Sequence, residues 1–359
     1  MTGGADRARA PWRVLVVDDS VTIRALLRAT LEADPRLRVV GEARDAFEAR
    51  EKIRALSPDV ITLDVEMPRM NGLEFLERLM RLRPTPVVMV SNRTTERSAD
   101  AVRALSIGAV DCVDVARLQS DHGQKAKLVE SLVCAASAQV QSRAGIRQTM
   151  RAPGIESQRD PFRWNGRMVL VGSSTGGVDA IERMLAPFPP DGPPCLIAQH
   201  MPEAFLRSFT QRLDDLISPN VRLAVAGDCP RQGEVLIAPG GATHLELSTG
   251  HMPRIVLEPA TGHELHVPSV DRLFESAVPL AGRTLAVLLT GMGSDGASGM
   301  AALRHAGART LAQTGETCVV DGMPRAARAA DAVERSVPID DLGRDILETC
   351  SARTAMTNG

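Results

Sequence analysis

The chain has 359 residues, which at roughly 150 residues per domain predicts two or three modules, each able to bury its own core. Hydrophobic residues make up 44% of the sequence and charged residues 24%, a composition that excludes collagen-like, coiled-coil and wholly disordered chains. The 42 Lys and Arg residues nearly balance the 44 Asp and Glu residues, for a formal net charge of −2. Bulk charge therefore predicts no binding to nucleic acid or to an anionic membrane surface.

Cysteine spacing and the length of the apolar runs bear on the compartment. The six cysteines are scattered, with no Cys-x-x-Cys pair and no Cys-His cluster at metal-ligand spacing, which favours a reducing cytosol. Apolar runs such as residues 284–290 are far shorter than the ~18 residues that cross a bilayer. No apolar stretch typical of a secretory signal precedes the first predicted strand. We expect a cytoplasmic protein without membrane insertion.

Residues 12–143 alternate short β-branched runs with segments of helical periodicity. In the first helical segment Ile23, Leu26, Leu27 and Leu31 recur on one face. This alternation predicts a doubly wound α/β domain with a parallel sheet. Five strands are predicted, at residues 14–17, 38–43, 60–65, 87–91 and 110–115.

Carboxylates stand at the ends of two of these strands. Asp18 and Asp19 follow the first strand, Asp64 lies near the end of the third, and Ser91 ends the fourth. Because the carboxyl ends of parallel strands line one crevice, the three carboxylates repel one another unless a hard cation such as Mg²⁺ neutralises them. The alternative, that each Asp only caps a helix, explains one residue at a time. We therefore predict that Asp18, Asp19 and Asp64 form a Mg²⁺ site.

The stretches 14-VLVVDDS-20, 64-DVEMPRMNG-72 and 87-VVMVS-91 resemble the receiver domain of response regulators, over about the first 130 residues. The resemblance implies a flavodoxin-like fold with a five-stranded parallel sheet. It also implies that Asp64 accepts a phosphoryl group from a histidine kinase, that Asp18 and Asp19 complete the Mg²⁺ site, and that Ser91 moves to meet the phosphate. Such chemistry is reasonable, since a new dianion can bias a bistable loop.

Two positions depart from the receiver pattern. Aligned on the fifth receiver strand, Val115 stands where the family carries a Lys that pairs with the phosphate. The same alignment places Cys112 where an aromatic switch residue is usual, and the chain contains no Tyr. We expect phosphoryl acceptance with weakened signal transmission.

Residues 144–165 lose all periodicity and fill with Arg, Gln, Pro and Gly, which predicts a linker. A second α/β domain is predicted for residues 166–350, with residues 1–11 as an extension and 351–359 as a tail. Its sheet is expected to be doubly wound and largely parallel, and two alternating runs around a Thr-Gly turn predict an antiparallel hairpin within residues 244–259. The other predicted strands lie at residues 167–172, 195–199, 221–226, 234–239 and 284–290.

Three strand ends of the second domain carry residues suited to nucleophilic catalysis. Ser174 lies between Gly172 and Gly176, the Gly-x-Ser-x-Gly pattern that exposes a hydroxyl at a tight strand-to-helix turn. Taken alone, such a turn could equally bind phosphate or cap a helix. His200 follows the second strand of the domain and Asp295 follows the last predicted one. Together they supply a nucleophile, a base and a carboxylate that orients the base.

Alternative interpretations of these stretches are weaker. The glycines at 291, 293 and 296 match the Gly-x-Gly-x-x-Gly of dinucleotide sites, but they follow most of the sheet and place Asp295 where a pyrophosphate would lie. Ser173 is a rival nucleophile whose position directly after a glycine does not fit the elbow. The chain order Ser, His, Asp disfavours the α/β-hydrolase fold. We expect structural or surface roles for the other histidines of this domain: His244, His251, His263, His266 and His305.

The second half of the chain also resembles a known family. Behind a receiver, the stretches GSSTGG (172–177), QHMP (199–202), IAPGGATHLEL (237–247), VPSVDRLFES (267–276), LTGMGSDGASGM (289–300) and GMPRAA (322–327) are similar to the chemotaxis protein-glutamate methylesterases. The resemblance implies hydrolysis of glutamyl methyl esters on cytoplasmic helices of chemoreceptors, related glutamine deamidation, and a receiver that covers the active site until it is phosphorylated. No cofactor is expected for ester hydrolysis.

Catalytic roles follow for the three strand-end residues. We expect Ser174 to be the nucleophile, His200 the base and Asp295 the group that fixes the imidazole, with backbone N–H groups of the 291–294 turn, Met292 among them, stabilising the oxyanion. A scaffolding module with a decayed site is disfavoured because all three residues are present. A transcriptional regulator would carry a basic helix-turn-helix segment, whereas about 190 residues of α/β pattern follow the linker.

Overall fold

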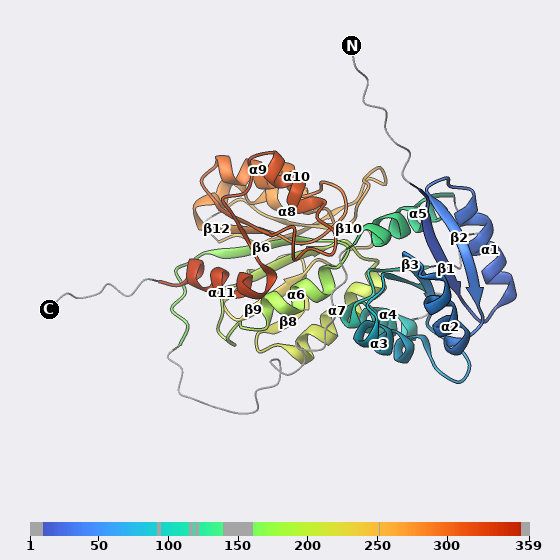
Figure 1. The fold of residues 1–359 in the computed structure, drawn as a ribbon. Helices are drawn as coiled ribbons and strands as arrows, with labels where there is room; N and C mark the ends of the chain where they lie inside the picture. The colour runs from blue at the N-terminus through green and yellow to red at the C-terminus, as the bar shows by residue number, and fades with distance from the viewer. Residues whose placement is uncertain are drawn as a thin grey trace, which may run out of the picture. The chain divides into compact units, whose positions relative to one another are not determined.

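The computed structural model describes residues 10–91, 95–114, 118, 122–138, 161–250 and 252–352. The chain divides into two compact units between residues 142 and 143, and each unit has its own parallel sheet (Figure 1). Within the described ranges, no helix combines the length and the apolar character needed to cross a bilayer.

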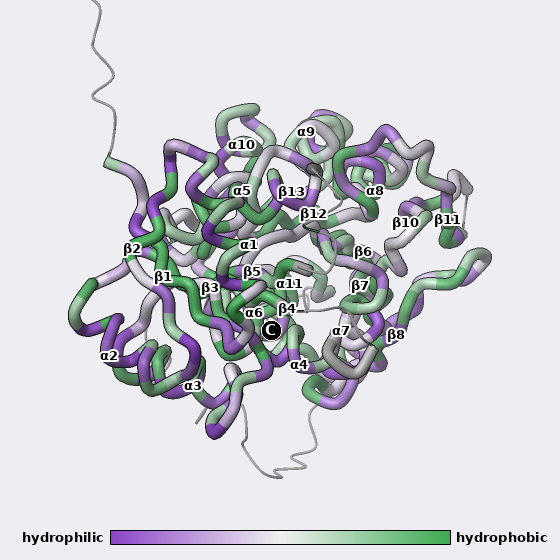
Figure 2. Tube along the Cα trace, turned by 90° about the vertical axis from the view of Figure 1, so that its right-hand side faces the viewer, coloured by the Kyte–Doolittle hydropathy of each residue, from purple (hydrophilic) through white to green (hydrophobic). Residues whose placement is uncertain are grey.

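The first unit is a five-stranded parallel sheet in the order β2-β1-β3-β4-β5, as predicted. Helix α1 contacts α5, and α3 contacts α4. The hydrophobic runs that predicted the strands are buried, and green segments gather at β1 and β3 in Figure 2. The elements are β1 (Trp12–Val17), α1 (Val21–Glu32), β2 (Leu37–Ala43), α2 (Ala46–Leu56), β3 (Val60–Asp64), α3 (Gly72–Leu82), β4 (Val87–Ser91), α4 (Thr95–Ile107), β5 (Asp111–Asp114) and α5 (His122–Ser137).

The second unit is a seven-stranded parallel sheet in the order β14-β13-β12-β6-β7-β9-β8. The first part of the unit runs through β6 (Met168–Ser173), α6 (Gly177–Leu185), β7 (Cys195–Gln199), α7 (Glu203–Leu216), β8 (Asn220–Leu223), β9 (Glu234–Ile237), β10 (Thr243–Leu247) and β11 (Ile255–Pro259). It continues through α8 (Val270–Ser276), a 3₁₀ helix η2 (Val278–Arg283), β12 (Thr284–Leu288), α9 (Ala297–His305), β13 (Arg309–Gln313), α10 (Met323–Ala329), β14 (Arg335–Val337) and α11 (Ile339–Cys350).

The predicted doubly wound parallel sheet and the antiparallel pair are both confirmed in this unit. Strands β10 and β11 form a two-stranded sheet of their own beside the large one. Two strands, β13 and β14, were not predicted, and they extend the sheet beyond β12. Their addition places β12, β6 and β7 near the middle of the sheet, where both neighbours of each strand are other strands.

The core of the second unit fixes the positions of the central strands. Inward-facing residues of β6, β7, β9 and β12 pack with one face of α8 and α9. Leu170, Leu196, Leu236, Phe274 and Leu288 are all fully buried there. Because a close-packed core has low compressibility, the loops that leave these strands start from fixed points.

Parts of the predicted segmentation lie outside the described residues, namely 1–9, 139–160 and 353–359. The last residues of the predicted linker are described and belong to the second unit. The N–H of Phe162 donates to Oδ2 of Asp191 at 2.7 Å, and Trp164 forms an antiparallel bridge with Ser351.

Candidate active site

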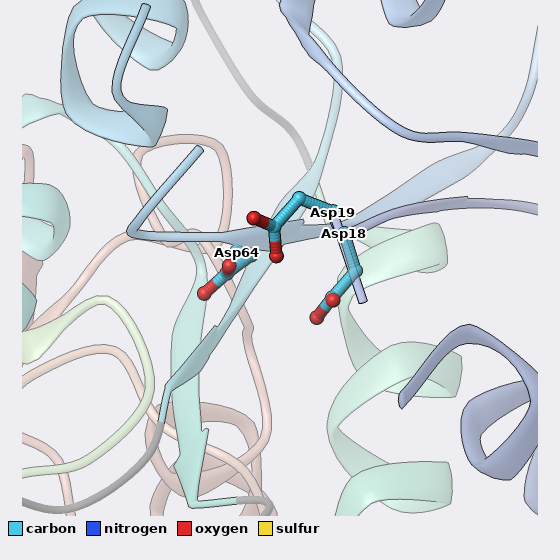
Figure 3. Close-up of side chains that lie close together, drawn as sticks. All are labelled: Asp18, Asp19 and Asp64. Atoms are coloured by element: carbon cyan, nitrogen blue, oxygen red, sulfur yellow. The ribbon is translucent and has the colours of Figure 1, made fainter. Parts of the chain in front are cut away.

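Asp18, Asp19 and Asp64 lie together at the carboxyl edge of the first sheet (Figure 3). One carboxylate oxygen of each residue lies within 4.8 Å of one from each of the others. The neighbouring helices α1 and α3 are capped by other side chains, those of Ser20 and Asn71. Helix capping therefore does not account for the three carboxylates.

Burial and mutual repulsion shift the pKa values in this cluster. Asp18 is 4% exposed, and burial raises its pKa to about 6 although the N–H of Ser20, 2.8 Å from its Oδ1, acts in the other direction. Burial and then the charge of Asp18 raise the pKa of Asp64 to about 7. A bound cation would remove this cost, and three carboxylates at this spacing fit the oxygen ligands that Mg²⁺ takes.

The remaining receiver positions are described only in part. Ser91 ends β4, one residue beyond Val90, which pairs in register with Asp64. The side chain of Ser91 and the whole of Val115 lie outside the described residues. Cys112 lies on β5, 7% exposed. A small buried thiol thus occupies the position at which an aromatic side chain is usual in receivers.

In the second unit, three neighbouring parallel strands bring the candidate catalytic residues to one edge of the sheet. Ser174 follows β6, and its N–H donates to the carbonyl of Thr290, beyond β12, at 3.1 Å. His200 follows β7, and its N–H donates to the carbonyl of Ser173 at 3.0 Å. Asp295 lies between β12 and α9. Residues far apart in the sequence therefore share one backbone hydrogen-bond network.

Ser174 stands in a tight turn between β6 and α6. The turn reaches the helix through Gly176, whose φ of +79° lies in the left-handed region that favours glycine. Gly291 packs closely against Ser174, and there is no room for a side chain at position 291: a Cβ atom there would lie only 2.7 Å from Cβ of Ser174. Ser174 is half-buried, whereas Ser173 is fully buried. Of the two hydroxyl groups, only that of Ser174 belongs to a residue that solvent reaches.

Gln199 joins the serine turn to the histidine turn. Its side chain is 2% exposed, and its Nε2 donates to the carbonyl oxygens of Ser174 at 2.9 Å and of His200 at 3.2 Å. Its Oε1 accepts a hydrogen bond from the hydroxyl of Ser173. The rival serine is therefore an anchor for this amide. From the sequence, Gln199 was predicted to end a strand and belongs to the QHMP stretch, with no role of its own, although a polar residue after an apolar run was an available signal.

His200 and Asp295 form a close pair. Nε2 of His200 lies 2.7 Å from Oδ2 of Asp295, and the two side chains are 7% and 10% exposed. Burial alone would raise the pKa of Asp295, but the hydrogen bond and charge of His200, with backbone N–H groups, hold it well below its usual range. Nδ1 of His200 is buried and has no hydrogen-bond partner among the described residues. Nδ1 is therefore the ring nitrogen left to accept a proton.

The start of helix α8 holds the carboxylate of Asp295. The N–H of Val270 donates to Oδ2 at 2.8 Å, and the N–H of Asp271 donates to Oδ1 at 2.9 Å. The hydroxyl of Ser269 donates to Oδ1 at 3.1 Å. A carboxylate held in this way is not placed to meet an anionic pyrophosphate, so the dinucleotide alternative loses its basis. No strand-end pattern predicts a role for residues 269–271, because they belong to a loop and to the start of a helix.

The turn after β12 lies directly beside Ser174. The carbonyl of Gly291 accepts hydrogen bonds from the N–H groups of Gly322 at 3.0 Å and Met323 at 2.9 Å, which tie the turn to the start of α10. Met292 comes next and is 38% exposed. The turn is therefore fixed on one side by α10 and reaches solvent at Met292.

One further histidine belongs to this site, in contrast to the structural or surface role expected for it. The ring of His266 stacks on the ring of His200, with centroids 4.1 Å apart and an interplanar angle of 10°. His251 lies outside the described residues.

Comparison with known proteins gives the same two-part division. Residues 14–114 match the response regulator receiver domain and residues 169–346 match CheB methylesterase. A protein-glutamate methylesterase/protein-glutamine glutaminase of Rhizobium etli is 47% identical over 348 residues, which cover 96% of this chain and 98% of the relative. A protein of Caulobacter vibrioides with the same activities in its name is 49% identical over 349 residues, 96% of this chain and 99% of the relative.

Among solved structures, the CheB methylesterase catalytic domain of Thermotoga maritima is 32% identical, with a TM-score of 0.49 over 51% of this chain and 98% of that chain. The matches to the curated relatives extend over nearly the full length of both partners, receiver included. The chain therefore belongs to the family of receiver-containing protein-glutamate methylesterases and protein-glutamine glutaminases.

Proposed function

We propose that this chain hydrolyses methyl esters of glutamyl side chains on the cytoplasmic helices of chemoreceptors, and that it deamidates certain glutamines at the same site. The observation that supports this most directly is the 2.7 Å contact between His200 and Asp295 at the sheet edge that also carries Ser174. The relatives named above carry both activities in their names.

In the proposed acylation step, Oγ of Ser174 attacks the side-chain carbonyl carbon of the substrate. Nδ1 of His200 takes the hydroxyl proton, because Nε2 is already hydrogen-bonded to Asp295. The tetrahedral intermediate then collapses, the bond to the methoxy oxygen breaks, and His200 returns the proton to form methanol. With a glutamine substrate the C–N bond breaks instead, and the protonated leaving group is ammonia.

Deacylation repeats the same proton movements with water. His200 takes a proton from water as the oxygen attacks the acyl carbon, and Ser174 leaves with that proton. The Asp295 carboxylate holds the imidazole and stabilises its positive form in both steps. Backbone N–H groups of the 291–294 turn, Met292 among them, would stabilise the oxyanion, a contribution of ~3 kcal/mol for one donor in studied hydrolases.

We assign the control of this activity to the receiver, with a boundary at residue 143 and a linker over 144–165 before the catalytic domain at 166–350. The Asp64 carboxylate would accept a phosphoryl group from a chemotaxis histidine kinase, and the Ser91 hydroxyl would meet the phosphate. Asp18, Asp19 and Asp64 would hold Mg²⁺, which supplies positive charge against the charge that gathers during phosphoryl transfer. Phosphorylation would uncover the active site that the unphosphorylated receiver blocks.

The test is methanol release from a methylated chemoreceptor by the full chain. Ser174→Ala should leave the thermal unfolding midpoint unchanged and lower turnover by several powers of ten, as in studied Ser-His-Asp hydrolases. Ser173→Ala is the matched control, and it should keep most of the activity although it loses the hydrogen bond to Gln199. Turnover close to that of the wild type in Ser174→Ala would refute the assignment.

A further inference from the structure

The stacked imidazole of His266 covers one face of the candidate base. The ring centroids of His200 and His266 are 4.1 Å apart, and the two planes differ by 10°. His266 is half-buried and comes from the loop between β11 and α8, not from a strand end. Two aromatic rings at this separation and angle are in face-to-face van der Waals contact.

A single hydrogen bond does not orient an imidazole completely. The contact between Nε2 and Asp295 fixes one edge of the His200 ring but does not by itself prevent rotation of the ring plane about the Cβ–Cγ bond. Such a turn would move Nδ1, the nitrogen that must meet the hydroxyl of Ser174. Contact with a second ring across the face of His200 restricts this motion, because the planes must stay nearly parallel for the contact to persist.

The loop that carries His266 is itself tied down on both sides of that residue. Beyond it, the N–H of Ser269 donates to Nδ1 of His244, which is fully buried, at 3.0 Å. Before it, Oε1 of Glu264 lies 3.7 Å from Nη1 of Arg272 in α8, and the Glu264 carboxylate also accepts hydrogen bonds from the N–H groups of Thr261 and Gly262, both at 3.0 Å. The loop can therefore hold a ring in a fixed plane.

The same loop continues directly into the groups that hold Asp295. Ser269, Val270 and Asp271 donate to the Asp295 carboxylate, while His266, three residues before Ser269, stacks on His200. One segment, residues 266–271, thus contacts both members of the base and carboxylate pair. Neither contact comes from the strands that carry the pair.

We propose that His266 is a positioning residue that sets the ring plane of His200 and thereby aims Nδ1 at the nucleophile. The inference rests on the proposed function, because it takes His200 as the base. The contact that carries the inference is the one between the faces of the two rings, so it requires a flat aromatic ring at position 266. The turnover number kcat should depend on that ring, while the Michaelis constant KM should not.

Two substitutions distinguish the effect of a flat ring at position 266 from the effect of side-chain volume. The assay is methanol release by the full chain from a methylated chemoreceptor. His266→Leu keeps apolar volume without a flat face and should lower kcat about tenfold, because a displaced base loses its near-attack geometry. His266→Phe restores the ring and should stay within about threefold of the wild type. KM should change by less than about twofold in both variants. His263→Leu, at an exposed histidine of the same loop, is the matched control and should keep wild-type kcat.

Thermal unfolding of each variant shows whether the fold is kept. A wild-type kcat in folded His266→Leu would overturn the inference, and so would a loss in His266→Phe as large as in His266→Leu. A change confined to KM would also overturn it, because it would assign His266 to substrate binding. Ser174→Ala, assayed alongside, keeps the two questions separate. An active Ser174→Ala refutes the proposed function, whereas an inactive one with unaffected His266→Leu refutes only the role of His266.

Discussion

Asp271 and Asp295 hold each other's helices: the carboxylate of Asp295 accepts a hydrogen bond from the first turn of α8, and that of Asp271 accepts one from the first turn of α9. The Asp295 carboxylate, just before α9, accepts from the N–H of Asp271 in the first turn of α8 at 2.9 Å. The Asp271 carboxylate accepts from the N–H of Gly299 in the first turn of α9 at 2.7 Å. Burial and then the charge of Asp295 raise the pKa of Asp271 to about 6. The two helices are thus locked together at the residue that pairs with His200, at an electrostatic cost.

Removing the charge of Asp271 should therefore stabilise the protein at alkaline pH. A carboxyl group whose pKa is higher in the folded state costs stability as pH rises from about 4 to about 6, and the full cost is present above that window. Asp271→Asn keeps an oxygen for the N–H of Gly299 and should gain about 1 kcal/mol at pH 8, after allowance for partial exposure. Unfolding midpoints measured from pH 4 to pH 8 should converge at pH 4. The exposed Asp341→Asn should show no such gain, and equal midpoints at pH 8 would contradict the prediction.

Gln199→Leu should impair catalysis more than a buried substitution usually does. The change leaves the Ser173 hydroxyl and the carbonyls of Ser174 and His200 without their shared partner. Leaving a buried polar group unsatisfied lowers the free energy of unfolding by about 1–3 kcal/mol. Because both turns can then shift, kcat for methanol release should fall about 100-fold. Gln232→Leu is the control: Gln232 is exposed and its amide also bridges two carbonyls, away from the site. A Gln199→Leu enzyme with kcat within about twofold of wild type would show that the hydrogen bonds of the Gln199 amide are not needed for catalysis.

Mg²⁺ should bind the receiver more tightly at pH 8 than at pH 6. The raised pKa values of Asp18 and Asp64, about 6 and about 7, mean that protons compete with the cation in this range. Without the cation, these carboxyl groups lower the free energy of unfolding as pH rises from about 4 through about 7. Bound Mg²⁺ should restore the stability that is lost in this range. We expect a dissociation constant about tenfold lower at pH 8, and proton release on binding at pH 6.5, measured by calorimetry in buffers of different ionisation enthalpy.

Asp64→Asn provides the comparison for the magnesium experiment. It removes the carboxyl group with the higher pKa, so proton release near pH 7 should disappear and the metal-free protein should be more stable at pH 8. Equal Mg²⁺ affinities at pH 6 and pH 8 in the wild type would contradict the linkage.

Activation by a phosphoryl mimic should be weak in the wild type and stronger in Val115→Lys. A phosphate on Asp64 would carry roughly two negative charges, and a lysine offers the charge-assisted contact that valine cannot make. A ligand shifts an equilibrium only by its differential affinity, so the lost contact reduces the available activation. Beryllofluoride should raise methanol release by the full chain only a few-fold, and more in Val115→Lys. Strong activation of the wild type, abolished by Asp64→Ala and unchanged by Val115→Lys, would show that the missing lysine has no effect.

The strands in the middle of the two sheets, such as β1, β6, β7 and β12, carry the runs of buried apolar residues that predicted them. The two strands that were not predicted lack such a run. In β14 only Val337 is buried, since the strand forms an edge of the sheet. In β13 the buried positions include Thr310 and Gln313, which hide the apolar pattern. Their polar groups are satisfied by tertiary partners, for example the N–H of Thr290, which donates to Gln313 at 2.8 Å. No local pattern reports such a partner.

The same distinction applies to the site. Ser174 and His200 directly follow recognisable strands, and Asp295 lies in the turn between β12 and α9. They could be proposed as a set from the sequence because parallel topology brings strand ends together. His266 and Ser269 come from a loop whose position depends on the packing of α8 and β10, so no strand end in the sequence predicts that they lie at the edge of the sheet. Gln199 was visible as a residue but its three partners were not, because they belong to turns from two different strands.

The adjacency of β6 and β12 also constrains how the enzyme becomes active during folding. The two strands pair residue for residue, with Thr284 opposite Met168 and Leu288 opposite Gly172. More than a hundred residues separate them in the sequence, so closing this loop costs chain entropy before any contact in the site repays it. Ser174 follows β6 and Asp295 follows β12, so the proposed nucleophile and the proposed orienting carboxylate come together only when that loop closes. Enzymatic activity should therefore return in refolding only with the slowest structural phase. A nascent chain whose β12 has not yet left the ribosome should have no functional site.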